Sequence, residues 1–189
     1  MAASDSSDPR PPDGTSDRAG EHGPAEPLDA DALQRRVAEE IKRCERHGTS
    51  LAVMLLVVDN LQELARDHGA ELSERTLSYI AGTLDGELRA FDRIGRPSDT
   101  ELMIVLPGAD GTRAEMVARR VLDRVSTIKI EADGARRTLL FSLGLAQWHG
   151  ESDAQDLLVE ARAAARGEGR AAGSDPVHSS PPPLGQEPR

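Results

Sequence analysis

An unbroken run of apolar residues, Leu51–Val58, constrains the fold of this chain more than any other feature. Thr49-Ser50 precedes the run and Asp59-Asn60 follows it, so turn-forming residues bound it at both ends. Such a run predicts a strand that is buried on both faces of a sheet. It is far too short to span a bilayer, which takes about 20 residues. We therefore expect the central strand of a soluble protein with no membrane contact.

Helical spacing of apolar residues marks the segments around this strand. Leu33, Val37, Ile41 and Cys44 recur on one stripe, and either Asp29 or Asp31 can cap the start of that helix. The same spacing predicts further helices starting at residue 61 and covering residues 77–88, 117–125 and 153–166.

The remaining strands are expected from apolar stretches next to turn formers. Residues 91–95 and 103–106 flank the polar stretch 96–102, which is the pattern of a hairpin. A strand is expected at 138–146, with a small one around 128–131. The resulting order, α-β-α-α-β-β-α-β-α, predicts an α/β (α+β) fold in which helices surround a mixed sheet of about five strands.

Composition narrows the class of protein. A chain of 189 residues has room for one domain, and its formal net charge of −10 argues against nucleic-acid binding. Cys44 is the single cysteine and has no internal disulfide partner. The first residues lack the basic start and apolar core of an export signal. These features predict a cytoplasmic protein.

Prolines divide the chain into three parts. Five of the twelve prolines lie in the first 27 residues and five in the last 19, among Ser, Asp, Gly and Glu. Segments of this composition have little to bury and are expected to be disordered. We therefore expect a disordered N-terminal segment at 1–27, a folded domain at 28–170 and a disordered Pro-rich tail at 171–189.

Several short motifs occur at characteristic positions along the folded part. They are the stretches Asp92-Arg93-Ile94-Gly95-Arg96, Leu106-Pro107, Ala118-Arg119-Arg120, Ser142-Leu143-Gly144-Leu145-Ala146 and Gly169-Arg170. Together with the order of elements, they resemble the GGDEF domain of diguanylate cyclases, enzymes that join two GTP molecules into cyclic di-GMP. The resemblance covers nearly all of residues 28–170 and implies a nucleotide-cyclase-like sheet.

The resemblance places the family's signature at Ser98-Asp99-Thr100-Glu101-Leu102, where the family has Gly, Gly, Asp or Glu, Glu and Phe. Only Glu101 keeps its residue type. The glycines that let the family's hairpin turn tightly are absent. Thr100 stands where the resemblance implies a metal-binding acid, and its hydroxyl is a poor ligand for Mg²⁺.

The first strand departs from the family in the same way. Val57 occupies the position of a metal ligand, and valine cannot bind a metal. Asp59 keeps the family's second acid, but we interpret it as a cap of the following helix. No metal or other cofactor is therefore expected. Because phosphoryl transfer depends on metals and positioned charges, the chain is predicted not to be an enzyme.

The substrate-binding positions are altered as well. Ala65 and Glu74 stand where the family has the Asn and Asp that select guanine. Arg166 and Arg170 match a Lys and an Arg that hold phosphates, although they are equally explained as cations near a helix C-terminus.

A second site resembles the family's product-binding inhibitory site. Arg89 and Asp92 have the R-x-x-D spacing just before the signature, and Arg120 matches a helix arginine that assists there. An arginine fork can pair with guanine O6 and N7, and an aspartate can accept from the guanine N–H edge. The alternative is an exposed Arg89–Asp92 ion pair of little energetic value.

These observations leave three hypotheses for function. The first is a catalytically inactive GGDEF-like signalling domain that binds cyclic di-GMP through Arg89, Asp92 and Arg120. The second is a scaffold or regulatory pseudo-enzyme that binds no nucleotide and contacts a protein partner, either a second copy or an active cyclase. The third is a weakly active diguanylate cyclase that recruits metal through Asp59 and Glu101.

Overall fold

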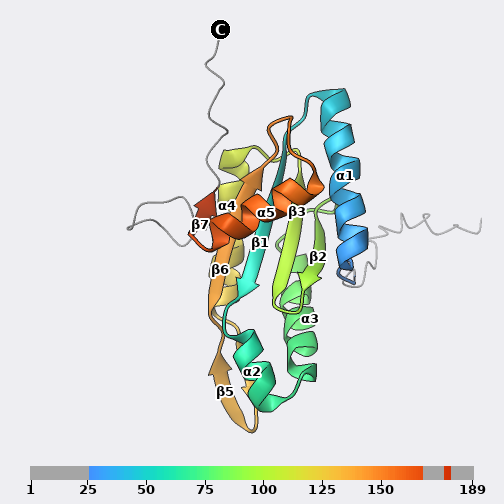
Figure 1. Ribbon diagram of the computed structural model, residues 1–189. Helices are drawn as coiled ribbons and strands as arrows, with labels where there is room; N and C mark the ends of the chain where they lie inside the picture. Colours follow the sequence, from blue (N-terminus) through green and yellow to red (C-terminus); the bar gives the residue numbers. More distant parts are fainter. Residues whose placement is uncertain (1–25, 168–176, 180–189) are drawn as a thin grey trace, which may run out of the picture.

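The computed structural model describes residues 26–167 and 177–179, which form a mixed five-stranded sheet, a two-stranded hairpin and five helices (Figure 1). The fold class agrees with the sequence prediction, and the predicted elements occur in the predicted order, with β5 and β7 in addition. The elements are α1 (Ala30–His47), β1 (Leu51–Val58), α2 (Leu61–His68), α3 (Glu71–Asp85), β2 (Arg93–Ser98), β3 (Glu101–Pro107), α4 (Gly111–Ser126), β4 (Lys129–Ala132), β5 (Ala135–Thr138), β6 (Phe141–Gln147), α5 (Ala154–Ala165) and β7 (Val177–Ser179).

The apolar run is the middle strand of the main sheet, whose order is β2-β3-β1-β6-β7. β1 is antiparallel to both β3 and β6, and β7 adds to β6 in parallel. The bounds of β1 coincide with the predicted strand. Burial by sheet neighbours and by helices on both faces explains why β1 carries no polar residue.

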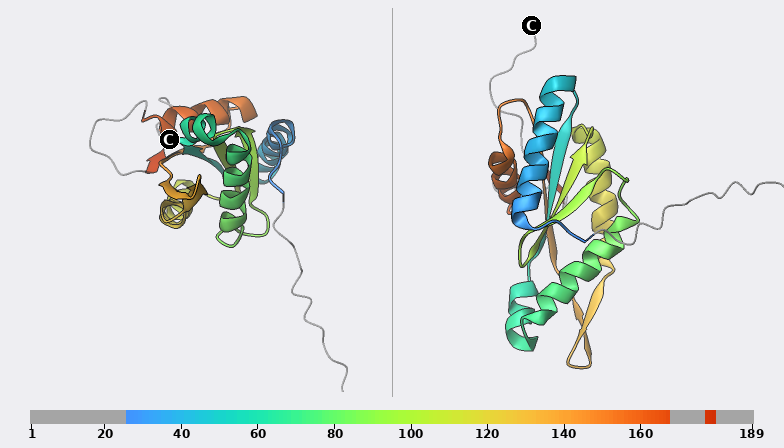
Figure 2. Two further views of the ribbon diagram at one scale, coloured as in Figure 1. Left: turned by 90° about the horizontal axis from the view of Figure 1, so that it is seen from below. Right: turned by 90° about the vertical axis from the view of Figure 1, so that its right-hand side faces the viewer.

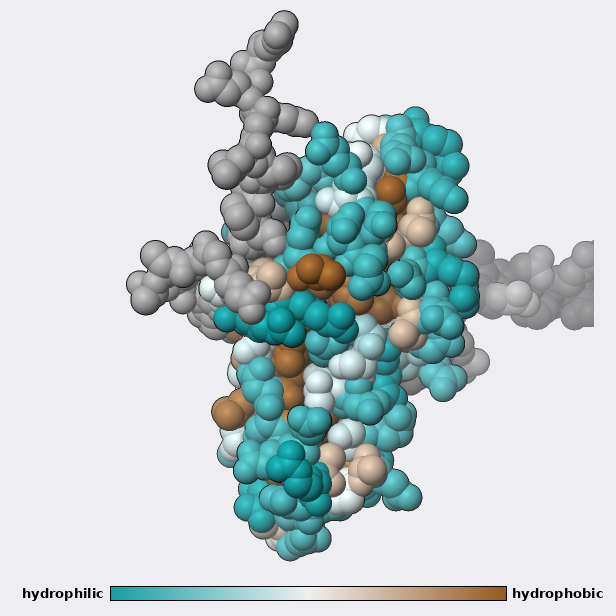
Figure 3. All heavy atoms as spheres, in the orientation of Figure 1, coloured by the Kyte–Doolittle hydropathy of each residue, from teal (hydrophilic) through white to brown (hydrophobic). Residues whose placement is uncertain are grey.

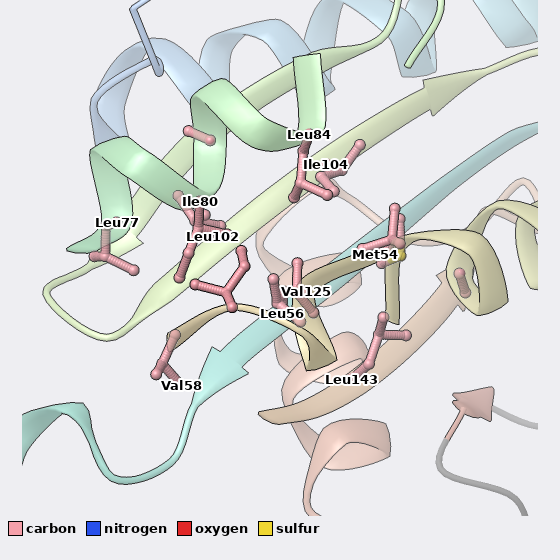
Figure 4. Packing of buried hydrophobic residues seen from close by; sticks show 14 of the residues in the cluster. Met54, Leu56, Val58, Leu77, Ile80, Leu84, Leu102, Ile104, Val125 and Leu143 are labelled. Carbon is pink, nitrogen blue, oxygen red and sulfur yellow. The ribbon is translucent and has the colours of Figure 1, made fainter. Parts of the chain in front are cut away.

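The sheet separates two hydrophobic clusters, with α3 and α4 on one face and α1 and α5 on the other (Figure 2). Side chains alternate between the faces along a strand. Met54, Leu56 and Val58 therefore point toward α3 and α4 (Figure 4), whereas Val53 and Leu55 point toward α1 and α5. β1 thus contributes to both halves of the core.

Local signals explain the ends of α1. The Asp29 carboxylate accepts a hydrogen bond from the backbone N–H of Ala32 at 2.7 Å, which settles the predicted cap in favour of Asp29. The helix ends at Gly48, which has a φ of 63° and donates its N–H to the Cys44 carbonyl. Glycine adopts this left-handed conformation without steric cost.

Two predicted elements have different limits in the structure. The helix expected at 77–88 ends at Asp85, and Leu88 lies in the following loop, although it still packs on the core. The strand expected at 138–146 is β6, which begins only at Phe141, whereas Thr138 is the last residue of β5. The Asn60 side chain binds the segment between β5 and β6, because it donates to the Thr138 carbonyl and accepts from the Leu140 N–H.

The expected terminal segments fall mostly outside the described residues. β7, however, lies within the stretch predicted to be a disordered tail, and its residues 177–179 pair with Leu143, Gly144 and Leu145 of β6. At the other end, Leu28 bonds to β2, because its N–H donates to the Ile94 carbonyl at 2.9 Å. The described part of the chain therefore begins against β2, the edge strand of the main sheet.

Hydrophilic residues dominate the face shown in Figure 3, with hydrophobic residues gathered in a strip across its middle. Within the described residues, no helix has both the length and the apolar character that crossing a membrane requires.

Candidate functional site

The carboxyl end of β1 lies between the β2–β3 hairpin and the start of β6. Val57 is the register partner of Glu101 on one side and of Ser142 on the other. The backbone N–H of Val58 donates to the Thr100 carbonyl at 2.9 Å. The structure therefore brings together the residues that the sequence assigned to the signature and to the end of the first strand.

Glu101, the one signature residue that keeps its type, is held by an arginine from α5. Its residue exposure is 9 %, and Arg162 approaches its carboxylate in the two-pronged way typical of guanidinium groups. Arg162 Nε donates to Oε1 at 3.0 Å, and Arg162 Nη2 donates to Oε2 at 2.7 Å. Ser98 Oγ also donates to Oε2, at 3.0 Å. Both carboxylate oxygens are therefore engaged within the protein.

This pairing decides the charge state of Glu101. Burial by itself would raise the pKa of the carboxyl, but hydrogen bonds from Arg162 and Ser98, with the charges of Arg162 and Arg166, bring the pKa of Glu101 below its ordinary value. Glu101 is therefore a carboxylate at neutral pH, and the guanidinium neutralises it.

The hairpin closes without the family's glycines. β2 ends at Ser98 and β3 begins at Glu101, so Asp99 and Thr100 form the tip. Among the described residues, Asp133 is the one non-glycine residue with a positive φ, so neither Ser98 nor Asp99 needs glycine's freedom. The Thr100 N–H points back to Ser98 Oγ at 3.4 Å. Ser98 is a structural part of this turn.

The interpretation of Asp59 as a helix cap is wrong. Asn60 is the N-cap residue of α2, and no side chain caps that end. Asp59 instead accepts a hydrogen bond from Ser142 Oγ at 2.8 Å, and its backbone N–H donates to the Leu140 carbonyl. Asp59 therefore links the end of β1 to β6. It would be the N-cap if α2 began at residue 60, but α2 begins at Leu61.

The two positions that would select guanine lie on α2 and α3. Ala65 on α2 is half-buried and offers no hydrogen-bonding side chain. Glu74 on α3 accepts from Arg96 of β2 at 2.5 Å, and this hydrogen bond, with the charge of Arg96, lowers the pKa of Glu74. A second acid of the candidate site is thus already paired with an arginine.

The two candidate phosphate-binding arginines differ in what the structure describes. Arg166 is exposed and follows the last residue of α5 as its C-cap, where a cation complements the helix dipole. Its charge also acts on Glu101. Arg170 lies outside the described residues.

These residues do not form a donor set that suits Mg²⁺, which prefers several oxygen ligands in octahedral geometry. Val57 offers no oxygen from its side chain, Thr100 offers a neutral hydroxyl, and the oxygens of Glu101 are bound by Arg162. No group of three or more His, Cys, Asp or Glu side chains converges anywhere in residues 26–167 or 177–179.

The R-x-x-D segment forms a tight turn before β2. The backbone N–H of Arg89 donates to Asp92 Oδ2 at 2.8 Å, and the Asp92 N–H donates back to the Arg89 carbonyl at 3.0 Å. Asp92 is 8 % exposed. Burial raises the pKa of Asp92, and the N–H of Arg89 and the charges of Arg89, Arg120 and Arg93 oppose this effect.

Arg89 does not form the surface ion pair that was the alternative interpretation. Within the described chain, its guanidinium makes no salt bridge to Asp92 and lies 5.9 Å from the centroid of the Phe91 ring. Phe91 is 48 % exposed, so an arginine and an aromatic ring face solvent side by side. Such a pair can contact the flat face of a nucleotide base.

Arg120 of α4 reaches the same region and is held by Glu87. Its Nη2 donates to the Glu87 carbonyl, and its Nε lies 3.4 Å from Glu87 Oε2. Arg124, one turn further along α4, has its Nε 3.9 Å from Glu87 Oε1. The charges of Arg89 and Arg120 thus both act on the buried Asp92, and Glu87 partly neutralises the two arginines of α4.

Sequence reasoning missed Arg162 and Glu87. Arg162 lies four residues after Leu158 on the inward side of an alanine-rich helix, so an arginine on an apolar stripe is a signal that could have identified it. Glu87 lies in a loop, and its role depends on the approach of α4. Trp148 packs on the α1–α5 cluster and donates its Nε1–H to the Ser152 carbonyl at 3.0 Å.

Comparison with known families agrees with this geometry. The family model for "Diguanylate cyclase, GGDEF domain" matches residues 30–174, which is most of the chain. The chain belongs to the GGDEF domain family.

Curated relatives are longer proteins. The chain is 29 % identical over 120 residues to the diguanylate cyclase DosC of Escherichia coli, covering 63 % of this chain and 26 % of DosC. It is 25 % identical over 128 residues to the uncharacterized membrane protein YdaK of Bacillus subtilis, covering 68 % and 45 % respectively. The chain thus spans less than half the length of either relative.

Solved structures share the fold. The diguanylate cyclase SiaD of Pseudomonas aeruginosa, solved with its activator SiaC, superposes with a TM-score of 0.69 and 27 % identity over 74 % of this chain and 54 % of SiaD. The GGDEF domain of DgcB from Caulobacter crescentus, solved with c-di-GMP, gives a TM-score of 0.71 at 15 % identity, covering 81 % and 91 %. The second likeness concerns the fold alone.

Proposed function

We propose that this GGDEF domain is a catalytically inactive signalling module that acts as a cyclic di-GMP receptor through Arg89, Asp92 and Arg120. The observation that carries the loss of activity is the Glu101–Arg162 pair. A carboxylate that must bind a metal cannot also give both oxygens to a guanidinium, and Val57 and Thr100 supply no replacement charge.

The receptor function rests on the surface around the R-x-x-D turn. The Arg89 guanidinium is exposed, and the hydrogen bond from the Arg89 N–H holds the turn in place. Guanine O6 and N7 suit an arginine fork, and phosphates suit a second arginine such as Arg120. DgcB, which shares the fold, has been solved with this ligand.

Calorimetric titration of the purified chain with cyclic di-GMP tests the receptor function. We expect binding in the wild type and a loss of at least about tenfold in Arg89→Ala, the size expected for a charged hydrogen bond. Arg66→Ala is the matched control, because Arg66 is an exposed arginine on α2, away from the turn. No binding heat in the wild type would exclude the receptor.

Incubation with GTP and Mg²⁺, followed by chromatography of the nucleotides, tests the loss of activity. We expect no cyclic di-GMP. Clear turnover would instead support the weakly active cyclase, which needs Asp59 and Glu101 to recruit metal despite their bonds to Ser142 and Arg162.

A function through protein contact alone is the second candidate. It is favoured by the large apolar side chains that remain exposed, among them Tyr79, Phe91 and Met116. SiaD, whose structure includes an activator protein, is a related precedent for a partner. Pull-down from the source cells with and without cyclic di-GMP distinguishes the candidates, because a receptor's partners should depend on the ligand.

A further inference from the structure

A groove of about 450 Å³ lies between α3, the end of α4 and the β4–β5 hairpin. We call it the α3–β4 groove. Its principal lining side chains come from four elements and are Tyr79, Thr83, Arg124, Lys129, Glu131 and Arg136. Its volume is in the range of pockets that hold a ligand or a few side chains of a partner.

Positive charge gathers at this groove although the whole chain is acidic. Arg124, Lys129 and Arg136 line it with one lining carboxylate, that of Glu131, while Glu87 lies outside the lining at 3.9 Å from Arg124 Nε. Between residues 113 and 137 the sequence has seven cations and four carboxylates, whereas the chain as a whole has a net charge of −10. An anionic partner is therefore repelled by most of the molecule and attracted here.

The groove also presents an aromatic surface. Tyr79, the chain's one tyrosine, is 60 % exposed. Ile128 and Ile130, which are 6 % and 8 % exposed, form part of the lining. Exposed tyrosine next to arginine is a combination enriched at protein interfaces, since the ring offers apolar area at a small entropic cost.

We propose that the α3–β4 groove docks an acidic segment of a partner protein. Its carboxylates pair with Arg124, Lys129 and Arg136, and one of its apolar side chains packs on Tyr79. The proposal goes beyond the receptor function and does not depend on it. Charge complementarity selects the occupant, because a basic or neutral segment gains nothing from three cations around an open groove.

The test uses the full chain and a fluorescein-labelled peptide, Glu-Glu-Leu-Glu-Glu-Leu, followed by fluorescence anisotropy at low ionic strength. The same peptide with Gln in place of Glu is the control probe. We expect the acidic peptide to bind, the Gln peptide not to bind, and added salt to weaken the complex.

Variants locate the site. Arg136→Gln should weaken binding about two- to fivefold, the range for one exposed ion pair. Arg137→Gln is the matched control, because Arg137 is the next residue on β5, is also exposed and does not line the groove. Glu131→Gln should strengthen binding, since it removes the groove's one carboxylate.

Absence of binding, or an equal loss in Arg136→Gln and Arg137→Gln, would overturn the proposal. A second copy of the chain is the competing occupant. It would appear as a dimer in sedimentation that Arg136→Gln disrupts, and that result would also overturn the assignment to a partner segment.

Discussion

The ion pair of Glu101 and Arg162 shows how single residues affect the stability of this domain. The Glu101 side chain is 12 % exposed and that of Arg162 is 28 % exposed, so both charges are largely shielded from water. A buried charge is costly without its partner, and removal of one partner is therefore more disruptive than its contact energy suggests.

We predict opposite effects of pH on the wild type and on Arg162→Gln. In the wild type the pKa of Glu101 is lowered, so its contribution to stability is present above the unfolded pKa and is lost as pH falls through the folded pKa. Without Arg162, burial dominates and raises the pKa of Glu101, so that contribution is present in acid and is lost as pH rises.

Urea unfolding at a series of pH values from about 3 to 7 measures this difference. At neutral pH, Arg162→Gln should lower the free energy of unfolding by about 1–3 kcal/mol. Arg113→Gln, at an arginine that is 62 % exposed, serves as the control. Parallel pH profiles for the wild type and Arg162→Gln would contradict the role given to this pair.

At the scale of elements, the close contact between β6 and α5 positions Arg162 over the sheet. A Cβ atom added to Gly144 would lie 2.0 Å from the Ala161 carbonyl oxygen and 2.4 Å from the Ala165 nitrogen. Backbone atoms cannot rotate away as a side chain can. α5 can therefore approach β6 this closely only because residue 144 has no side chain.

We predict that Gly144→Ala lowers the free energy of unfolding by about 3 kcal/mol or more, because overpacking forces α5 away from the sheet. Gly82→Ala is the matched control, since no atom lies within 4 Å of the added methyl group in α3. That variant should be more stable than the wild type by about 0.5–1 kcal/mol. Thermal and urea denaturation measure both. Equal behaviour of the two variants would refute the packing argument.

For the molecule as a whole, the sheet joins the two hydrophobic clusters into one cooperative unit. β3, like β1, sends alternate side chains to opposite faces, with Ile104 in the α3–α4 cluster and Val105 in the α1–α5 cluster. Neither cluster can be lost while β3 and β1 remain paired. Unfolding should therefore be a single transition.

Ile104→Val tests this coupling. It removes one methylene from the α3–α4 face and should cost about 0.5–1.5 kcal/mol. Trp148 packs on the opposite face, yet its fluorescence midpoint in urea should shift as much as the midpoint from circular dichroism. A shift in circular dichroism alone would mean that the two faces unfold separately.

Much of the fold was predictable because local patterns specify it. The β1 run, the Asp29 cap and the hairpin around Ser98 to Glu101 depend on residues close in sequence. Contacts with distant residues were not predictable in this way. Asn60 binds the segment between β5 and β6 from a position 78 residues before Thr138, and no periodicity reports such a bond.

The features of the candidate site also fall into two groups, those recognised from sequence position and those that depend on contacts between distant residues. Position in the sequence predicts Arg89, Asp92 and Arg120 as ligand residues, and it locates Glu101 and the replacements at Val57 and Thr100. The sequence by itself therefore determined most of the elements, the family resemblance and which signature positions carry other residue types. Only the tertiary structure decided that Arg162, 61 residues from Glu101, binds both of its oxygens, because that contact depends on how closely α5 packs on β6.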